Sequence, residues 1–118
     1  MPSATGGEAD WTEAALVLRR AGMLTEAVAL DWVALRAALF DWLGSAGVAY
    51  DGTRDAMVVG MTALGGKLAA DLAFVYHVAT MAEWDATFRV TEAQARTVAD
   101  ACARVSAAFQ SGSEHKPG

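Results

Sequence analysis

The chain has 118 residues, a formal net charge of −5, one cysteine and two histidines. This length suits a single domain spanning residues 1–118, and the scattered nine Lys and Arg residues argue against nucleic acid as a partner. A lone cysteine excludes an internal disulfide, and two distant histidines argue against a metal site.

Both ends of the chain are rich in small and polar residues, so residues 1–7 and 111–118 are predicted to be disordered tails. The N-terminal stretch lacks the positive region and the apolar core of a cleavable signal peptide. The most apolar window, residues 57–81, is interrupted by Lys67 and Asp71, which argues against stable membrane insertion. We therefore expect a cytoplasmic protein, with secretion without a cleaved signal peptide left open.

A first helical arm is predicted from residue 8 to residue 43, because apolar residues recur there at steps of three and four. The apolar stripe consists of Trp11, Ala14, Leu18, Leu24, Val28, Trp32, Leu35, Leu39 and Trp42. Gly22 can end one helix and Thr25 can cap the next. A break at Gly22 is the preferred interpretation, and a continuous helix is the alternative.

Residues 40–52 form the clearest bend of the sequence, since three glycines and an Asp-Gly pair separate two apolar segments. Glycine tolerates the positive φ that a helix C-terminus often needs, so Gly44 or Gly47 can end the first arm. An aspartate or threonine among residues 51–55 can then cap the following helix.

A second arm is predicted over residues 53–89. Its stripe consists of Met57, Met61, Leu64, Leu68, Leu72, Val75 and Ala79. Two such stripes are typical of antiparallel helices that pack at about 20°. The glycines at 60, 65 and 66 weaken the helix, but a glycine that faces another helix allows the two backbones to approach closely. Trp42 is expected to pack near Met57 or Met61.

The tetrapeptide Thr91-Glu92-Ala93-Gln94 has the pattern of a capping box and predicts the start of a further helix. This helix should end before Ser111, and its apolar stripe is Val98, Cys102, Val105 and Phe109. A break near Val90 is preferred, although one helix running through to Phe109 is also compatible with the pattern.

No catalytic motif is present: the sequence has no nucleophile elbow, no phosphate-binding loop and no zinc-binding helix motif. His77 has no acidic or nucleophilic residue at helical spacing, and Cys102 lies on an apolar stripe, where a thiol usually behaves as a small hydrophobe. The sequence therefore predicts a protein that is not an enzyme and that binds no cofactor.

The bend resembles the Trp-x-Gly bend of the WXG-type (Esx-like) family, the small helical-hairpin substrates of type VII secretion. Trp42 and Gly44 match the bend motif, and Ala49 and Tyr50 match residues commonly found just after it. The resemblance implies a helical hairpin that pairs with itself or with a cognate helical subunit and leaves the cell uncleaved, with the secretion ATPase as a further partner.

The same family carries a C-terminal secretion signal, Tyr-x-x-x-Asp or Glu. The nearest fit here is Phe88 with Glu92, where Phe replaces Tyr. The signal requires both residues to lie on one helix face at positions i and i+4.

A partner is also expected on physical grounds, because a two-helix hairpin has no interior and leaves apolar surface uncovered. The predicted interface consists of Trp32, Leu35, Leu39, Met57, Met61, Leu64 and Trp84.

Two all-α architectures are compatible with these patterns. The first is the antiparallel hairpin with a Trp-x-Gly bend and an additional C-terminal helix. The alternative is a compact four-helix bundle with helices at about 9–21, 25–43, 54–82 and 91–109. A bundle of that kind would be a non-secreted binding module of an immunity-like, antitoxin-like or phage-encoded adaptor type.

Overall fold

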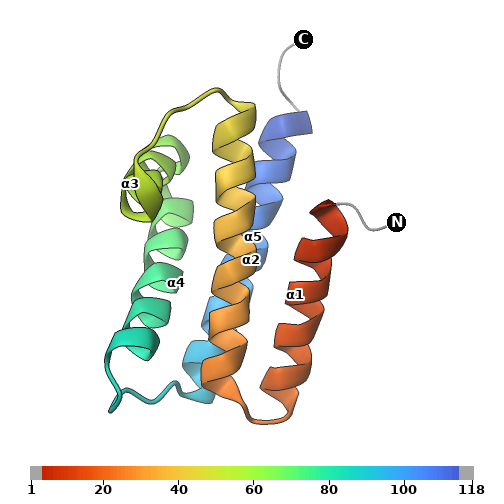
Figure 1. Ribbon diagram of the computed structural model, residues 1–118, viewed down its shortest axis with the longest axis vertical. Coiled ribbons are helices and arrows are strands. Elements are labelled where there is room, and N and C mark those ends of the chain that lie inside the picture. Colours follow the sequence, from red (N-terminus) through yellow and green to blue (C-terminus); the bar gives the residue numbers. More distant parts are fainter. Residues whose placement is uncertain (1–3, 115–118) are drawn as a thin grey trace.

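The computed structural model describes residues 4–114, which form five α-helices and no strand (Figure 1). The helices are α1 (Ala4–Arg20), α2 (Leu24–Ser45), α3 (Gly52–Leu64), α4 (Gly66–Trp84) and α5 (Glu92–Glu114). Helix α2 contacts each of the other four. The all-α class is confirmed, but the structure is a compact globule with dimensions of 46 × 33 × 23 Å, in which each predicted arm is divided into two helices.

The break at Gly22 is confirmed. Gly22 has a φ of +82°, and the amides of Gly22 and Met23 donate to the carbonyls of Arg19 and Leu18. This pair of bonds is a Schellman motif, which satisfies carbonyl groups that the end of α1 would otherwise leave unpaired. The predicted cap of the next helix is different, because Met23 rather than Thr25 occupies the N-cap position of α2.

The bend after α2 is made at Gly47 and not at Gly44. Helix α2 continues through Gly44 to Ser45, and Gly47 has a φ of +73°. The amides of Gly47 and Val48 donate to the carbonyls of Gly44 and Leu43, which repeats the Schellman motif found at the end of α1. Of the two glycines considered from the sequence, Gly47 therefore carries the left-handed conformation.

The second arm is interrupted at Gly65 and Gly66, whose φ values are +68° and +52°. Helix α3 consequently folds back toward α2 and α4, and in Figure 1 it is seen nearly end-on beside α4. Gly60 permits this packing, since a Cβ there would lie 2.8 Å from Cδ1 of Leu39. The expectation that a glycine facing another helix allows close approach is thus confirmed at Gly60.

Helices α4 and α5 are separate, as preferred from the sequence. The predicted capping box is present: the Gln94 amide donates to the Thr91 hydroxyl at 3.0 Å, and the Thr91 amide donates to the Gln94 side-chain oxygen at 3.0 Å. Between the helices, the Asp85 carboxylate accepts hydrogen bonds from the amide and the hydroxyl of Thr87. These contacts fix the loop of residues 85–91.

The helices extend further toward both ends of the chain than the sequence predicted. Residues 4–7 belong to α1 and residues 111–114 belong to α5, where disordered tails were expected. Residues 1–3 and 115–118, the outer parts of those tails, lie outside the described residues. Within residues 4–114, none of the helices is both long enough and apolar enough to span a membrane.

The core lies where α2, α4 and α5 meet, and most of its large side chains belong to the stripes identified in the sequence, with Leu43 and Val78 as additions. Its most deeply buried large side chains are Val28, Leu35, Leu39, Leu43, Leu72, Val75, Val78, Val98 and Val105. Burial of apolar area contributes about 25 cal/mol per Å² and is the main stabilising contribution to a bundle of this kind. Helices α2, α4 and α5 therefore form the centre of the bundle, and α1 and α3 pack against them.

Candidate functional site

The residues considered for chemistry show no catalytic arrangement. His77 is exposed on α4, and Cys102 is partly buried on α5, with its Sγ donating to the carbonyl oxygen of Asp31 at 3.7 Å. Burial raises the pKa of the Cys102 thiol, and the nearby Asp31 charge raises it further, so the reactive thiolate is disfavoured. Among the described residues, no group of three His, Cys, Asp or Glu side chains could hold a metal ion.

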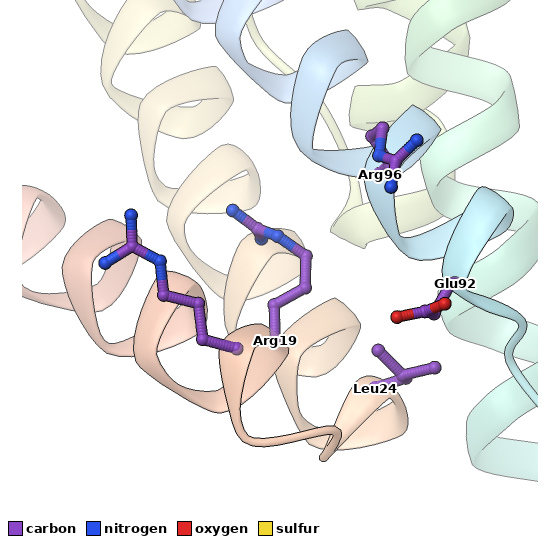
Figure 2. A pocket seen from close by; sticks show the side chains of 5 residues that line it. Arg19, Leu24, Glu92 and Arg96 are labelled. Atoms are coloured by element: carbon purple, nitrogen blue, oxygen red, sulfur yellow. The ribbon is translucent and has the colours of Figure 1, made fainter.

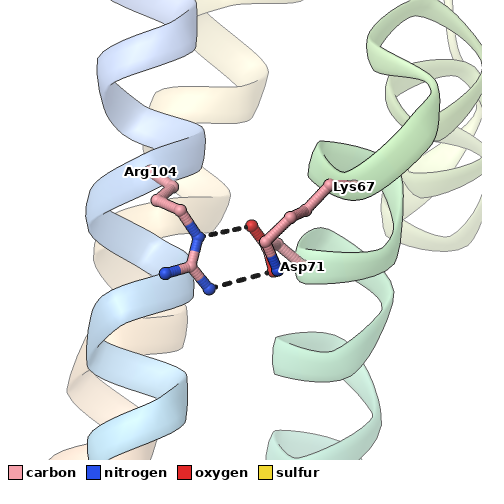
Figure 3. Close-up of polar contacts among 3 residues, drawn as sticks. All are labelled: Lys67, Asp71 and Arg104. Atoms are coloured by element: carbon pink, nitrogen blue, oxygen red, sulfur yellow. Dashed lines mark hydrogen bonds and ion pairs between the residues drawn. The ribbon is translucent and has the colours of Figure 1, made fainter.

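A buried aspartate joins α4 to α5 (Figure 3). Asp71 accepts hydrogen bonds from Nε of Arg104 at 2.8 Å and from a terminal nitrogen of Arg104 at 3.1 Å, while Nζ of Lys67 lies at 3.5 Å. The Arg104 hydrogen bonds outweigh burial and lower the pKa of Asp71 below its ordinary value. The paired geometry indicates a structural ion pair, because every oxygen of the carboxylate is already engaged.

A second buried aspartate joins α1 to α2 less tightly. One oxygen of Asp31 lies 3.3 Å from a terminal nitrogen of Arg19, and the Asp31 side chain is only 6% exposed. Burial raises the pKa of Asp31 to about 6, with the positive charge of Arg19 opposing that shift in part. The sequence analysis did not identify either aspartate as the partner of an arginine. The available signal was the presence of a charged residue within a largely apolar segment, which indicates a buried ion pair.

Trp42 packs within the chain, and its aromatic partner lies on α5, a helix that the sequence did not predict as its neighbour. Its ring stacks on Phe109 of α5, with centroids 4.6 Å apart and an interplanar angle of 25°. The sequence predicts Met57 or Met61 of α3 as its neighbour, whereas the ring on which it stacks belongs to α5, which returns alongside α2. The ring of Trp42 therefore forms part of the contact between α2 and α5.

The other bend residues are spread over the last turn of α2 and the loop that follows. Gly44 is exposed within the helix, and Ala49 is exposed in the loop. Tyr50 stacks on Phe40 with centroids 5.2 Å apart and an interplanar angle of 16°. The two aromatic members of the motif, Trp42 and Tyr50, thus contact rings of their own chain.

The segment proposed as a secretion signal is not a continuous helix. Phe88 lies in the loop of residues 85–91 and is partly buried against the core, whereas Glu92 is the first residue of α5. The two side chains therefore do not share a helix face, and the predicted i to i+4 geometry is absent.

The residues predicted as a partner interface separate into three groups. Trp32, Leu35, Leu39 and Met57 are at most 9% exposed and belong to the chain's own core. Met61 and Leu64 are partly buried against that core. Trp84 differs from the rest, because 78% of its surface is exposed.

An arginine-lined hollow, here called the arginine pocket, lies where α1 ends and where α2 and α5 begin (Figure 2). It measures about 170 Å³ and is lined by Arg19, Arg20, Leu24, Glu92 and Arg96. Among residues 11–111, no carboxylate forms an ion pair with Arg20 or Arg96. The sequence shows the neighbouring pair Arg19-Arg20, but only the fold brings Arg96 to them.

Trp84 lies at the same end of the bundle as the arginine pocket. Figure 1 shows the turn between α1 and α2 and the loop between α4 and α5 at one end of the long axis. Met23, in the first of these, is 45% exposed, and Trp84 ends α4 just before the second. We call this region the Trp84 end: the turn of residues 21–23, the loop of residues 85–91, Trp84 and the arginine pocket.

Comparison with protein-family models, with curated proteins and with solved structures gives no match. The Trp84 end therefore offers two features that are suited to binding other molecules: the exposed indole of Trp84 and the arginine pocket.

Proposed function

We propose that this protein is a non-enzymatic helical module that acts by binding another protein through its Trp84 end. The observation that supports the proposal is the 78% exposure of Trp84. Leaving an indole in water forgoes the free energy that its burial would supply, on the order of 2 to 3 kcal/mol for a large apolar side chain. A protein partner that covers the ring on binding would recover this free energy.

The surroundings of Trp84 favour a protein as the bound molecule. Trp and Arg dominate the residues that carry binding energy in protein interfaces, and Met is also enriched there. Exposed Met23 and the three arginines of the pocket are at the same end. The other strongly exposed apolar side chains, Val17 and Val58, are isolated valines on α1 and α3.

The test is site-specific photo-crosslinking in the source cells. A photoreactive phenylalanine analogue at position 84 should yield one defined adduct, identified by mass spectrometry, whether the partner is a second copy or a different subunit. The same analogue at position 58 of α3, which is 57% exposed, serves as the matched control. Adducts that are absent at position 84, or equal at both positions, would contradict the proposal.

Type VII secretion is the second candidate function, with a cognate helical subunit or the secretion ATPase as partner. It is favoured by one observation: Trp42 and Gly44 occupy the end of a long helix, immediately before the turn at Gly47. The test is the appearance of the uncleaved chain in the culture medium. Export that persists without the secretion ATPase, or no export at all, would remove this candidate.

A further inference from the structure

We infer that the arginine pocket binds a carboxylate group of the partner, so that the partner presents an acidic segment to the Trp84 end. This inference rests on the protein-binding function proposed above and names the chemistry of the partner.

The pocket carries more positive than negative side chains. Three arginines and one acidic residue, Glu92, line one small hollow of a chain whose net charge is −5. Arg19 has a single contact with Asp31 at 3.3 Å, and no carboxylate of residues 11–111 pairs with Arg20 or Arg96. An external anion that enters the pocket therefore gains a favourable interaction with Arg20 and Arg96, which no ion pair with these carboxylates offsets.

The shape of an arginine side chain also matches a carboxylate. A guanidinium group presents parallel N–H donors that match the two oxygens of a carboxylate. Arg104 binds Asp71 in this manner within the same protein, with donor–acceptor distances of 2.8 and 3.1 Å. Arg20 and Arg96 are exposed and have the same donors available, so each can make the equivalent contact with an Asp or Glu side chain of a partner.

The remaining two residues of the pocket favour an acidic protein over a nucleic acid. Glu92 also lines the pocket, so the hollow suits one or two carboxylates better than a continuous chain of phosphates, and the nine Lys and Arg residues scattered through the sequence provide no extended basic surface for such a chain. Leu24 supplies an apolar surface in the same hollow. The expected ligand is therefore a peptide segment in which an acidic side chain lies beside an apolar one.

The inference is tested by titrating the isotope-labelled protein with a probe peptide, acetyl-Leu-Glu-Asp-Glu-Leu-amide, and following the arginine side-chain Nε–H signals by NMR. We expect shifts at Arg19, Arg20 and Arg96, and weaker binding as the salt concentration rises. The uncharged peptide, with Gln and Asn in place of Glu and Asp, should not bind.

Two variants sharpen this test. The double variant Arg20→Gln, Arg96→Gln should weaken peptide binding by about tenfold or more, because two charge-assisted contacts are lost. Both residues are exposed, so the fold should be retained, and far-UV circular dichroism checks this. The control Arg54→Gln removes an exposed arginine from α3 and should leave the affinity unchanged.

The outcomes separate this inference from the proposed function. Absent peptide binding, or undiminished binding by the double variant, overturns carboxylate recognition, and the adduct at position 84 then decides the protein-binding function alone. Tighter binding of oligothymidylate or of inorganic phosphate at the same arginines would also overturn the inference, in favour of a phosphate ligand. Peptide binding without any adduct at position 84 would sustain the acid-binding pocket and contradict the proposed function.

Discussion

The indole ring of Trp42 lies nearly parallel to the ring of Phe109, with the two centroids 4.6 Å apart. The contact joins the last turns of α2 to the later turns of α5, two helices that are distant in sequence and adjacent in the fold. Aromatic pairs of this kind contribute about 0.5 to 1.5 kcal/mol beyond the area that they bury.

Replacement of Trp42 by Ala should lower the free energy of unfolding by about 2 to 3 kcal/mol, since the ring is partly rather than fully buried. Trp84→Ala is the matched control and should change the free energy of unfolding by less than about 0.5 kcal/mol, because Trp84 is 78% exposed. Urea denaturation followed by circular dichroism measures both. Equal losses in the two variants would show that one of the rings is misassigned.

The glycines of the bend should respond to substitution in opposite ways. Gly47→Ala places a Cβ on a residue with a φ of +73° and should destabilise the protein by about 1 kcal/mol. Gly44→Ala should stabilise it by about 0.5 kcal/mol, because Gly44 is helical and has open space where a Cβ would lie. Thermal melting of the pair gives the sign of each effect, and a reversed order would place the left-handed residue at Gly44.

Asp31 should make the protein more stable in mild acid. Its pKa is about 6 in the folded state, against 3.8 ordinarily, so protonation favours the folded state. The resulting stabilisation is complete below about pH 3.8 and is lost as the pH rises through about 6, with a total on the order of 3 kcal/mol. The variant Asp31→Asn should lose this dependence between pH 4 and pH 7, measured as unfolding free energy in urea. A wild-type curve as flat as that of the variant would contradict the assignment.

Asp71 should have the opposite effect on the pH dependence of stability, since its pKa is lowered by the Arg104 hydrogen bonds. Its contribution to the free energy of unfolding is fully present above pH 3.8, the ordinary pKa. That contribution is lost only as the pH falls through the lower pKa of the folded state. At neutral pH, Asp71→Asn should cost about 1 to 2 kcal/mol through the loss of charged hydrogen bonds. Lys67→Gln is the control: the Lys67 side chain is 73% exposed and its Nζ lies 3.5 Å from Asp71, so the cost should stay below about 0.5 kcal/mol.

Local signals in the sequence were sufficient for much of the fold. The apolar steps of three and four identified the core faces, and the Thr91–Gln94 capping box placed the start of α5. Gly22 was recognised as a helix end because a Schellman motif requires only neighbouring residues.

Features that depend on distant parts of the chain were not predictable. An interior glycine costs a helix only about 1 kcal/mol, so the sequence could not decide that Gly65 and Gly66 interrupt the second arm. The partner of Trp42 is Phe109, and the arginine pocket combines Arg19 and Arg20 with Arg96. Each of these pairings requires α5 to return alongside the N-terminal helices, which no local pattern reports.

The two left-handed glycines between α3 and α4 also have a consequence for motion. Helix α3 contributes only Ala56, Met57 and Gly60 to the buried residues, whereas α2 contributes seven. A segment with few buried contacts and a glycine hinge opens locally at a lower free energy than the core. The backbone amides of residues 52–64 should therefore exchange with deuterium well before those of α2, so that a partly open form with α3 released exists in equilibrium with the intact bundle.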